Sequence, residues 1–431
     1  MNSKIRTRFA PSPTGLLHVG GLRTALYNYL FAKQNGGQFM LRIEDTDRAR
    51  LLEGAEKNII ETLRIFGLDF DEGPIRQSDH LEKYKERAEE LIQKGAAYED
   101  GGAIRFKMPK DGVTKFTDII RGEIQIENET QEDFVILKSD GFPTYNLAHL
   151  VDDHDMAITH VIRGDEFISS MPKYIALHKA FGWELPQYAH LPLLLNKDRA
   201  KLSKRESDKA VKVLLEEDGY LEEAVLNFVA LLGWHPKTDQ EIFSLEELIK
   251  EFKLEDVQKA GAIFDIQKLD WMNGEYIRKK TPKELVELAA PFLEKEGEGD
   301  SSFLEKIIAL EQPRLKKLSE MPERTDYFFR EPEYDVSLLK WKNMDDNQTK
   351  NSLELSAELL KAVNDKDFNK ENLEKIFLDR AKKFQDRGEL LWPLRVALTG
   401  KKASPGPFEI MEILGKESSI SRLEAALDML K

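Results

Sequence analysis

The chain has 431 residues, a formal net charge of −14 and no cysteine. This length exceeds what one compact core usually spans, so several domains are expected. The missing thiols exclude disulfides and thiolate zinc sites, and no apolar run approaches the roughly 20 residues of a membrane helix. The first ten residues lack the continuous apolar segment of a secretory signal, so we expect a cytoplasmic protein.

The first hundred residues alternate strand and helix patterns. A short strand is predicted over 4–10, a helix over 20–34 and a second strand over 38–43. Two further helices are expected over 54–66 and 79–94, each ending at a glycine. Strand, helix and strand at these lengths are typical of a βαβ unit in a parallel sheet.

The pattern then changes to short antiparallel runs, such as 103–108, 123–126 and 134–137, separated by Gly and Pro turns. This pattern predicts an insertion in a nucleotide-binding sheet. The alternation resumes with a strand over 158–163, a helix near 170–181 and a strand over 191–195. The chain beyond residue 205 is mainly helical, with a Glu/Gly-rich break at 294–300. The expected regions are a catalytic domain in two halves over 1–97 and 138–198, an inserted region over 98–137, a segment over 199–281, and two helical subdomains over 282–330 and 331–431.

A Pro- and Gly-rich turn over 11–21 lies between the first predicted strand and helix. Gly20 and Gly21 allow backbone to approach a ligand closely at a helix N-terminus, where amide groups attract phosphate. His18 in the same turn can donate a hydrogen bond to phosphate oxygens. Taken alone, the segment is more simply explained as a βα turn with a chance histidine. Neither a Walker sequence nor a clean GxGxxG occurs.

A basic segment, Lys201-Leu-Ser-Lys-Arg205, follows a predicted strand near mid-chain. By itself it is explained best as a solvated run of charge. Together with the histidine–glycine turn it fits the two halves of a nucleotidyl-transfer site. In that interpretation, Lys201 and Lys204 neutralise the pyrophosphate that leaves when the α-phosphate is attacked.

Several further strings occur in a fixed order along the chain: Arg8-Phe-Ala-Pro-Ser-Pro-Thr-Gly15, Leu41-Arg-Ile-Glu-Asp-Thr-Asp47, Val151-Asp-Asp-His154, Ile162-Arg-Gly-Asp-Glu166, Phe264-Asp265 with Trp271-Met-Asn-Gly274, and Pro393-Leu-Arg-Val-Ala-Leu-Thr-Gly400. With the turn and the basic segment, they resemble the bacterial-type glutamyl-tRNA synthetases, which are class I aminoacyl-tRNA synthetases. The resemblance covers nearly the whole chain.

The resemblance implies a Rossmann-type α/β catalytic domain with an inserted α+β acceptor-binding region, followed by an all-α anticodon-binding region. It implies ATP with Mg²⁺ as the energy source and a short insert without zinc, so no metal ligands are assigned. His18, Lys201 and Lys204 are expected to be catalytic. The expected ATP-binding residues are Pro11, Ser12, Thr14, Gly15, His18, Gly20, Gly21, Glu166 and Lys204. Gly21 replaces the second histidine of the family's HIGH motif, and Leu202 and Arg205 depart from the KMSKS letters; we interpret these as variants.

A glutamate site must satisfy two carboxylates and one ammonium group, which requires arginines and a carboxylate. Arg8 and Arg163 lie at the ends of predicted parallel strands, where open α/β sheets bind ligands. Glu44 is placed for the ammonium group, although an acidic cluster at a helix start explains it equally well. Tyr145 is equally well explained as a core aromatic without the resemblance. The family pattern implies a glutamate site of Arg8, Ala10, Ser12, Glu44, Tyr145 and Arg163.

The expected activity is ATP-dependent formation of glutamyl-adenylate from L-glutamate and transfer to the 3′ end of tRNA(Glu). The insert would meet the acceptor end, the segment 199–281 the inner corner of the tRNA, and the last helices the anticodon, with Arg314 as the candidate contact. The acidic net charge weighs against nucleic-acid binding. Alternatives are an enzyme that also charges tRNA(Gln), a glutaminyl enzyme, and an inactive tRNA-binding relative. We expect a monomer and no membrane partner.

Overall fold

The computed structural model describes residues 4–200, 210–293 and 300–431. Lys201 and Lys204 therefore lie outside the described residues. The chain forms two compact units, Met1–Met272 and Asn273–Lys431. Helix α10 (Ile266–Lys279) contributes to both units, which are described one at a time.

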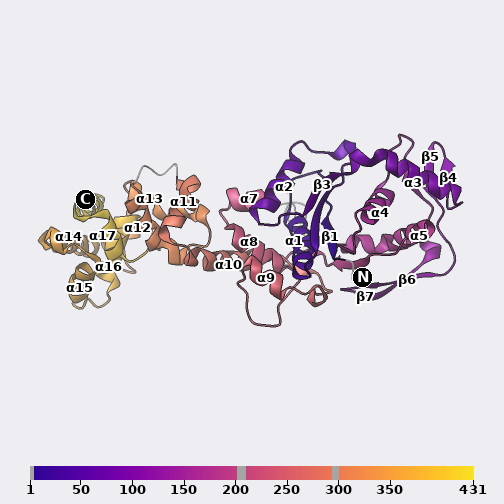
Figure 1. Cartoon of the computed structure of the whole chain (residues 1–431). Coiled ribbons are helices and arrows are strands. Elements are labelled where there is room, and N and C mark those ends of the chain that lie inside the picture. The colour runs from indigo at the N-terminus through magenta and orange to yellow at the C-terminus, as the bar shows by residue number, and fades with distance from the viewer. Residues whose placement is uncertain (1–3, 201–209, 294–299) are drawn as a thin grey trace. The chain divides into compact units, whose positions relative to one another are not determined.

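Unit 1 is built on a parallel sheet (Figure 1). Strands β1 (Arg6–Phe9), β2 (Gln38–Ile43) and β3 (Glu72–Arg76) pair in parallel, and so do β9 (His160–Gly164) and β10 (Gln187–Leu191). Next to β9, the Thr159 N–H donates to the Arg6 carbonyl at 3.0 Å, which brings β9 beside β1. The resulting order β3-β2-β1-β9-β10 is that of a Rossmann-type sheet and confirms the predicted fold class.

The first helix and strands follow the predicted pattern because their apolar residues are buried. Helix α1 (Val19–Gln34) buries Leu22, Leu26 and Leu30 completely, and five of the six β2 residues are buried. Such burial on both faces is characteristic of parallel strands covered by helices. The remaining helices of unit 1 are α2 (Ala55–Ile65), α3 (Leu81–Gln93), α4 (Tyr145–Asp155), α5 (Met171–Phe181), α7 (Val211–Glu216), α8 (Glu222–Ala230) and α9 (Leu245–Glu251).

The last predicted strand of the sheet is wrong in its bounds. Strand β10 ends at Leu191, because Pro192 cannot donate a ladder hydrogen bond. The chain then forms the two-residue strand β11 (Leu194–Leu195), which pairs with β12 (Ala262–Ile263). The strand expected over 191–195 therefore covers only the last residue of β10 and the two residues of β11, which belong to different sheets.

The inserted strands form two substructures. Strands β4 (Ala97–Asp100), β5 (Ala103–Phe106) and β8 (Phe134–Leu137) make an antiparallel sheet. Strands β6 (Val113–Asp118) and β7 (Gly122–Glu127) make a hairpin. The hairpin joins the edge of the catalytic sheet through one registered pair, Tyr188 with Asp118. Part of the insert is thus an extension of the nucleotide-binding sheet.

Unit 2 is a group of packed helices (Figure 1). Its helices besides α10 are α11 (Pro282–Leu293), α12 (Ser301–Glu311), α13 (Met321–Phe329), α14 (Asp346–Ala362), α15 (Lys370–Ala381), α16 (Gly388–Thr399), α17 (Pro407–Leu414) and α18 (Lys416–Asp428). Leu353, Phe377 and Leu394 are fully buried in its core. No helix in the described ranges combines the length and apolar character needed to cross a membrane.

Candidate active site

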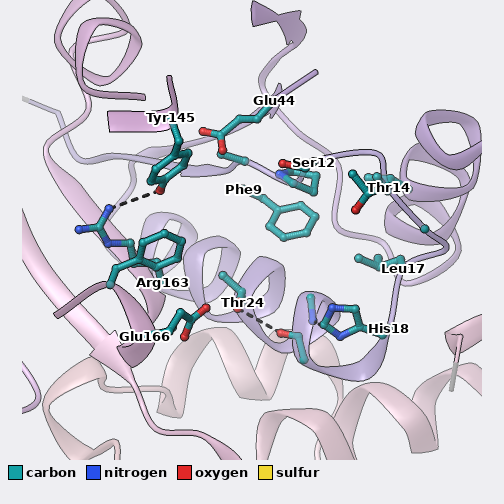
Figure 2. A pocket seen from close by; sticks show the side chains of 18 of the residues that line it. Phe9, Ser12, Thr14, Leu17, His18, Thr24, Glu44, Tyr145, Arg163 and Glu166 are labelled. Carbon is teal, nitrogen blue, oxygen red and sulfur yellow. Dashed lines mark hydrogen bonds between the residues drawn. The ribbon is translucent and has the colours of Figure 1, made fainter. Parts of the chain in front are cut away.

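A cavity of about 810 Å³ opens in unit 1 where β1, β2 and β9 end. Parallel strands of an open sheet present their carboxyl ends to ligands at such a point. All the candidate residues of unit 1 within the described ranges line it, namely Arg8, Ala10, Pro11, Ser12, Thr14, Gly15, His18, Gly20, Gly21, Glu44, Tyr145, Arg163 and Glu166. Figure 2 shows Tyr145 and Arg163 on one side of the cavity and Thr14 and His18 on the other.

His18 caps the N-terminus of α1. Its Nδ1 accepts a hydrogen bond of 3.2 Å from the Gly21 N–H, so the neutral ring must carry its proton on Nε2. A Cβ at Gly20 would lie 3.1 Å from Cε1 of the His18 ring, closer than side chains normally pack. Glycine at this position therefore allows the imidazole to lie against the start of the helix.

The chain on either side of the basic segment contacts this site. Leu194 of β11 lines the cavity before the segment. After it, Ala210 bridges to His18, and the Val211 N–H donates to the Leu17 carbonyl at 2.9 Å. Lys201 and Lys204 are joined to these described flanks on both sides by only a few residues.

A buried charge network lies under the amino-acid end of the cavity. Asp153, near the end of α4, accepts from Arg8 Nε at 2.9 Å and from Arg42 Nη1 at 2.6 Å. Arg42 also pairs with Glu44 at 2.9 Å and lies 3.7 Å from Asp152. Two guanidinium groups thus face three carboxylates, which leaves an excess of negative charge beside the cavity.

Burial and pairing shift the pKa values of these carboxyls in different directions. Burial raises the pKa of Glu44 and of Asp152, and the Arg42 charge offsets only part of this effect. Burial also acts on Asp153, but the charges of Arg8 and Arg42 outweigh it and hold the pKa of Asp153 below its usual value. Of these three carboxyls, Asp153 is therefore the one that stays ionised to the lowest pH.

Arg163 has a different environment. Among the described residues no carboxylate forms an ion pair with it, although its side chain is buried. Its guanidinium stands over the rings of Phe167 at 4.7 Å and Tyr174 at 4.8 Å, and Nη1 lies 3.5 Å from the Tyr145 hydroxyl. Aromatic faces stabilise the cation without neutralising it. The group is placed to receive an anion from the cavity.

Sequence patterns alone did not single out Arg42, Asp118 or His190. A charged or polar residue within an apolar strand was the available signal, since Arg42 lies in β2 and His190 in β10, both fully buried. Asp152 and Asp153 lie near the end of α4, where they order arginines from two strands.

Arg314 lies in unit 2, in a short helical turn after α12. Its side chain is about one-third exposed, and Nη1 lies 3.5 Å from the buried Glu311 carboxylate. Arg324 approaches the same carboxylate at 3.7 Å. The structure thus places Arg314 and Arg324, both partly exposed, around one buried carboxylate.

Within the part of the chain that is described, no group of three or more His, Asp and Glu side chains is arranged to hold a metal ion.

A family model for the catalytic domain of class I tRNA synthetases (E and Q) matches residues 4–103 and 99–271. An anticodon-binding domain model matches residues 284–427.

Full-length relatives agree with these matches. The chain is 43% identical to a glutamate–tRNA ligase of Clostridium kluyveri and 44% identical to one of Clostridium tetani, in both cases over 100% of this chain and at least 98% of the relative. The crystal structure of a glutamate tRNA ligase from Elizabethkingia meningosepticum, in complex with its amino acid, superimposes with a TM-score of 0.89. That chain is 34% identical, and 100% of each chain is covered.

Proposed function

The chain belongs to the glutamate–tRNA ligases of class I, and from this we propose that its cavity binds L-glutamate and ATP and makes glutamyl-adenylate for transfer to tRNA(Glu). One observation carries the assignment of the amino-acid end. An unneutralised arginine and a carboxylate network with excess negative charge face one cavity, and glutamate offers carboxylates and an ammonium group to match them.

Arg163 is the proposed partner of the glutamate side-chain carboxylate, because it lies on the side of the cavity away from His18 (Figure 2). Glu44 takes the ammonium group, where the excess negative charge of its network stabilises the cation. The Arg8 fork toward Asp153 uses Nε and Nη2, so Nη1 is the atom proposed to meet the substrate. Tyr145 closes the site beside Arg163, and Ala10 and Ser12 form its floor with backbone and hydroxyl groups.

ATP is proposed to bind at the other end. The amides at the start of α1 and the Nε2–H of His18 face the phosphates, while Gly20 and Gly21 keep that approach open. The other assigned contacts are Pro11, Ser12, Thr14, Gly15 and Glu166. Mg²⁺ would arrive with the triphosphate, since the assigned residues supply no metal cage.

The reaction is proposed to proceed in two displacements. An α-carboxylate oxygen of glutamate attacks the α-phosphorus, the bond to the bridging β-phosphate oxygen breaks, and pyrophosphate leaves. Lys201 and Lys204 neutralise that leaving charge. A terminal ribose hydroxyl of the tRNA then attacks the carbonyl carbon, and AMP departs with the bonding electron pair. No enzyme nucleophile is needed, so positioning and charge stabilisation supply the acceleration.

The rest of the chain is assigned to the tRNA. We propose that the insert 98–137 meets the acceptor end, that 199–281 contacts the inner corner, and that 282–330 and 331–431 bind the anticodon, with Arg314 as a contact. The tRNA assignment is supported by the matched anticodon-binding model. A working monomer in the cytoplasm, where charged tRNA is used in protein synthesis, is part of this proposal.

Parallel charging of purified tRNA(Glu) and tRNA(Gln) with radiolabelled glutamate tests the proposal. Charging of tRNA(Glu) alone supports it, and charging of both would indicate the non-discriminating form. Label on neither tRNA, from protein that binds tRNA, would indicate an inactive relative. Labelling of tRNA(Gln) alone would contradict the tRNA assignment.

A further inference from the structure

A chain of hydrogen bonds connects the inserted hairpin to Arg163. Asp118, the last residue of β6, accepts from His190 Nδ1 at 2.7 Å. His190 Nε2 in turn accepts from Arg163 Nε at 3.3 Å. Arg163 and His190 are registered partners on β9 and β10, and Asp118 is registered with Tyr188 on the other side of β10.

Asp118 is held firmly enough to orient its neighbour. Its Oδ1 accepts from the backbone N–H groups of Ile120 at 3.0 Å and Arg121 at 2.8 Å. Its Oδ2 accepts from the His190 backbone N–H at 3.0 Å, in addition to the imidazole. The carboxylate is 1% exposed and has several fixed donors, so its position is determined by the backbone of the β6–β7 turn and of strand β10.

The proton positions follow from these partners. An ionised carboxylate only accepts, so the His190 proton is on Nδ1, and an arginine Nε–H only donates, so Nε2 must present its lone pair. Burial lowers the pKa of His190, against the opposing effect of Asp118, and the ring is therefore neutral at pH 7. A neutral acceptor orients Arg163 without pairing its charge.

We infer that Asp118 and His190 are positioning residues for glutamate binding: the inserted hairpin fixes the imidazole tautomer, and the imidazole aims the Arg163 guanidinium into the cavity. This inference rests on the proposed function, which assigns Arg163 to the substrate carboxylate. It makes the insert a structural component of the amino-acid site in addition to its assigned contact with tRNA.

This chain of hydrogen bonds from Asp118 through His190 explains why Arg163 is oriented by an imidazole and not by a direct ion pair with a carboxylate. A direct ion pair would compete with glutamate for the same donors. A carboxylate that is separated from Arg163 by the imidazole can orient the guanidinium and leaves its positive charge available to the substrate. The other hydrogen-bond acceptors of Arg163 among the described residues, the Tyr145 hydroxyl at 3.5 Å and the Met171 sulfur at 3.2 Å, are weak and do not neutralise the guanidinium either.

Asp118→Asn is the first test. Its amide can donate to Nδ1, which would move the imidazole proton to Nε2 and place two donors face to face at Arg163. We expect the KM for glutamate in tRNA charging to rise roughly tenfold or more, with the KM for ATP unchanged. Asp133→Asn is the control: this insert carboxylate also accepts from a backbone N–H, that of Met108 at 3.0 Å, but its side-chain donor is the Tyr98 hydroxyl and not His190.

A pair of substitutions at His190 separates orientation from packing. His190→Phe keeps a ring but removes the acceptor, and it should raise the KM for glutamate about as much as Asp118→Asn. His190→Gln restores an oxygen that can accept from Arg163, and it should return the KM to within about threefold of the parent value. A purely structural role would predict that His190→Gln is as impaired as His190→Phe.

These experiments test the positioning role of Asp118 and His190 even if one of the variants does not fold. An unchanged KM for glutamate in folded Asp118→Asn or His190→Phe overturns the inference, and so does a failure of His190→Gln to outperform His190→Phe. If Asp118→Asn does not fold, the His190 pair alone decides. Arg163→Lys tests the underlying assignment. If Arg163→Lys leaves the KM for glutamate unchanged, the proposed function fails at that residue. If Arg163→Lys raises this KM strongly while Asp118→Asn leaves it unchanged, only the positioning role of Asp118 and His190 is refuted.

Discussion

The guanidinium of Arg42 lies 2.6 Å from the carboxylate of Asp153, with the two side chains 0% and 5% exposed. This contact joins the second strand of the sheet to helix α4 beneath the amino-acid end of the cavity. A buried ion pair contributes little net stability compared with an apolar pair, but removing one partner leaves the other charge uncompensated.

Arg42→Met should therefore destabilise unit 1 strongly, by about 3–5 kcal/mol, because Asp152 and Asp153 would remain buried with less compensating charge. Urea unfolding monitored by tryptophan fluorescence measures the change. Arg105→Met is the control, since Arg105 pairs with Asp100 on the surface at 2.7 Å and should cost less than about 1 kcal/mol. An equal decrease in the free energy of unfolding in the two variants would show that the buried network contributes no more to stability than a surface ion pair.

Asp153 should make stability depend on pH in a defined window. Its pKa is lower in the folded chain than the value of about 3.9 in an unfolded one. Its contribution is therefore complete above roughly pH 5 and is lost as the pH falls below about 4. The difference in urea midpoint between the parent protein and Asp153→Asn should narrow steadily on acidification. A difference that widens toward low pH would contradict this sign.

Lys204→Ala and His18→Ala should affect chemistry far more than glutamate binding. Both groups are assigned to the phosphates, so we expect pyrophosphate exchange in the presence of tRNA to slow by about a hundredfold to a thousandfold. The KM for glutamate should remain within about threefold of the parent value. Comparable losses in rate and in glutamate binding would count against these roles. Omitting tRNA from the same assay tests whether activation depends on it.

Gly20→Ala should separate stability from activity. Alanine favours a helix over glycine by up to about 1 kcal/mol, so the thermal midpoint should stay the same or rise. The new methyl group would lie 3.1 Å from the His18 ring and displace it from its position on the helix start. The kcat for adenylate formation should therefore fall. A simultaneous drop in the thermal midpoint would instead indicate a general disruption of the turn.

Local patterns predicted much of the chain. The bounds of β2 match the expected range, and α1 and α5 start within one residue of the expected starts at 20 and 170. The apolar segments of α1 and β2 are separated by the turn signal of Gly36 and Gly37. The predicted strand pattern missed β3, where Gly73 and Pro74 interrupt the alternation, and it missed β6 and β10 as separate strands. β3 and β10 pair with strands that a helix separates from them along the chain, whereas β6 pairs mainly with the neighbouring strand β7.

The sequence by itself determined the fold class, the histidine–glycine turn and the set of residues that the cavity of unit 1 brings together. The turn and the strand–helix alternation follow from local patterns along the chain, and the residue set follows from the resemblance of its motifs to a known family. Only the tertiary structure decided how the charges combine. Arg8 and Arg42 share Asp153 from 145 and 111 residues away, and Arg163 is oriented through His190 by a carboxylate from the insert. Buried charges find their partners through packing in three dimensions, and no linear spacing encodes that choice.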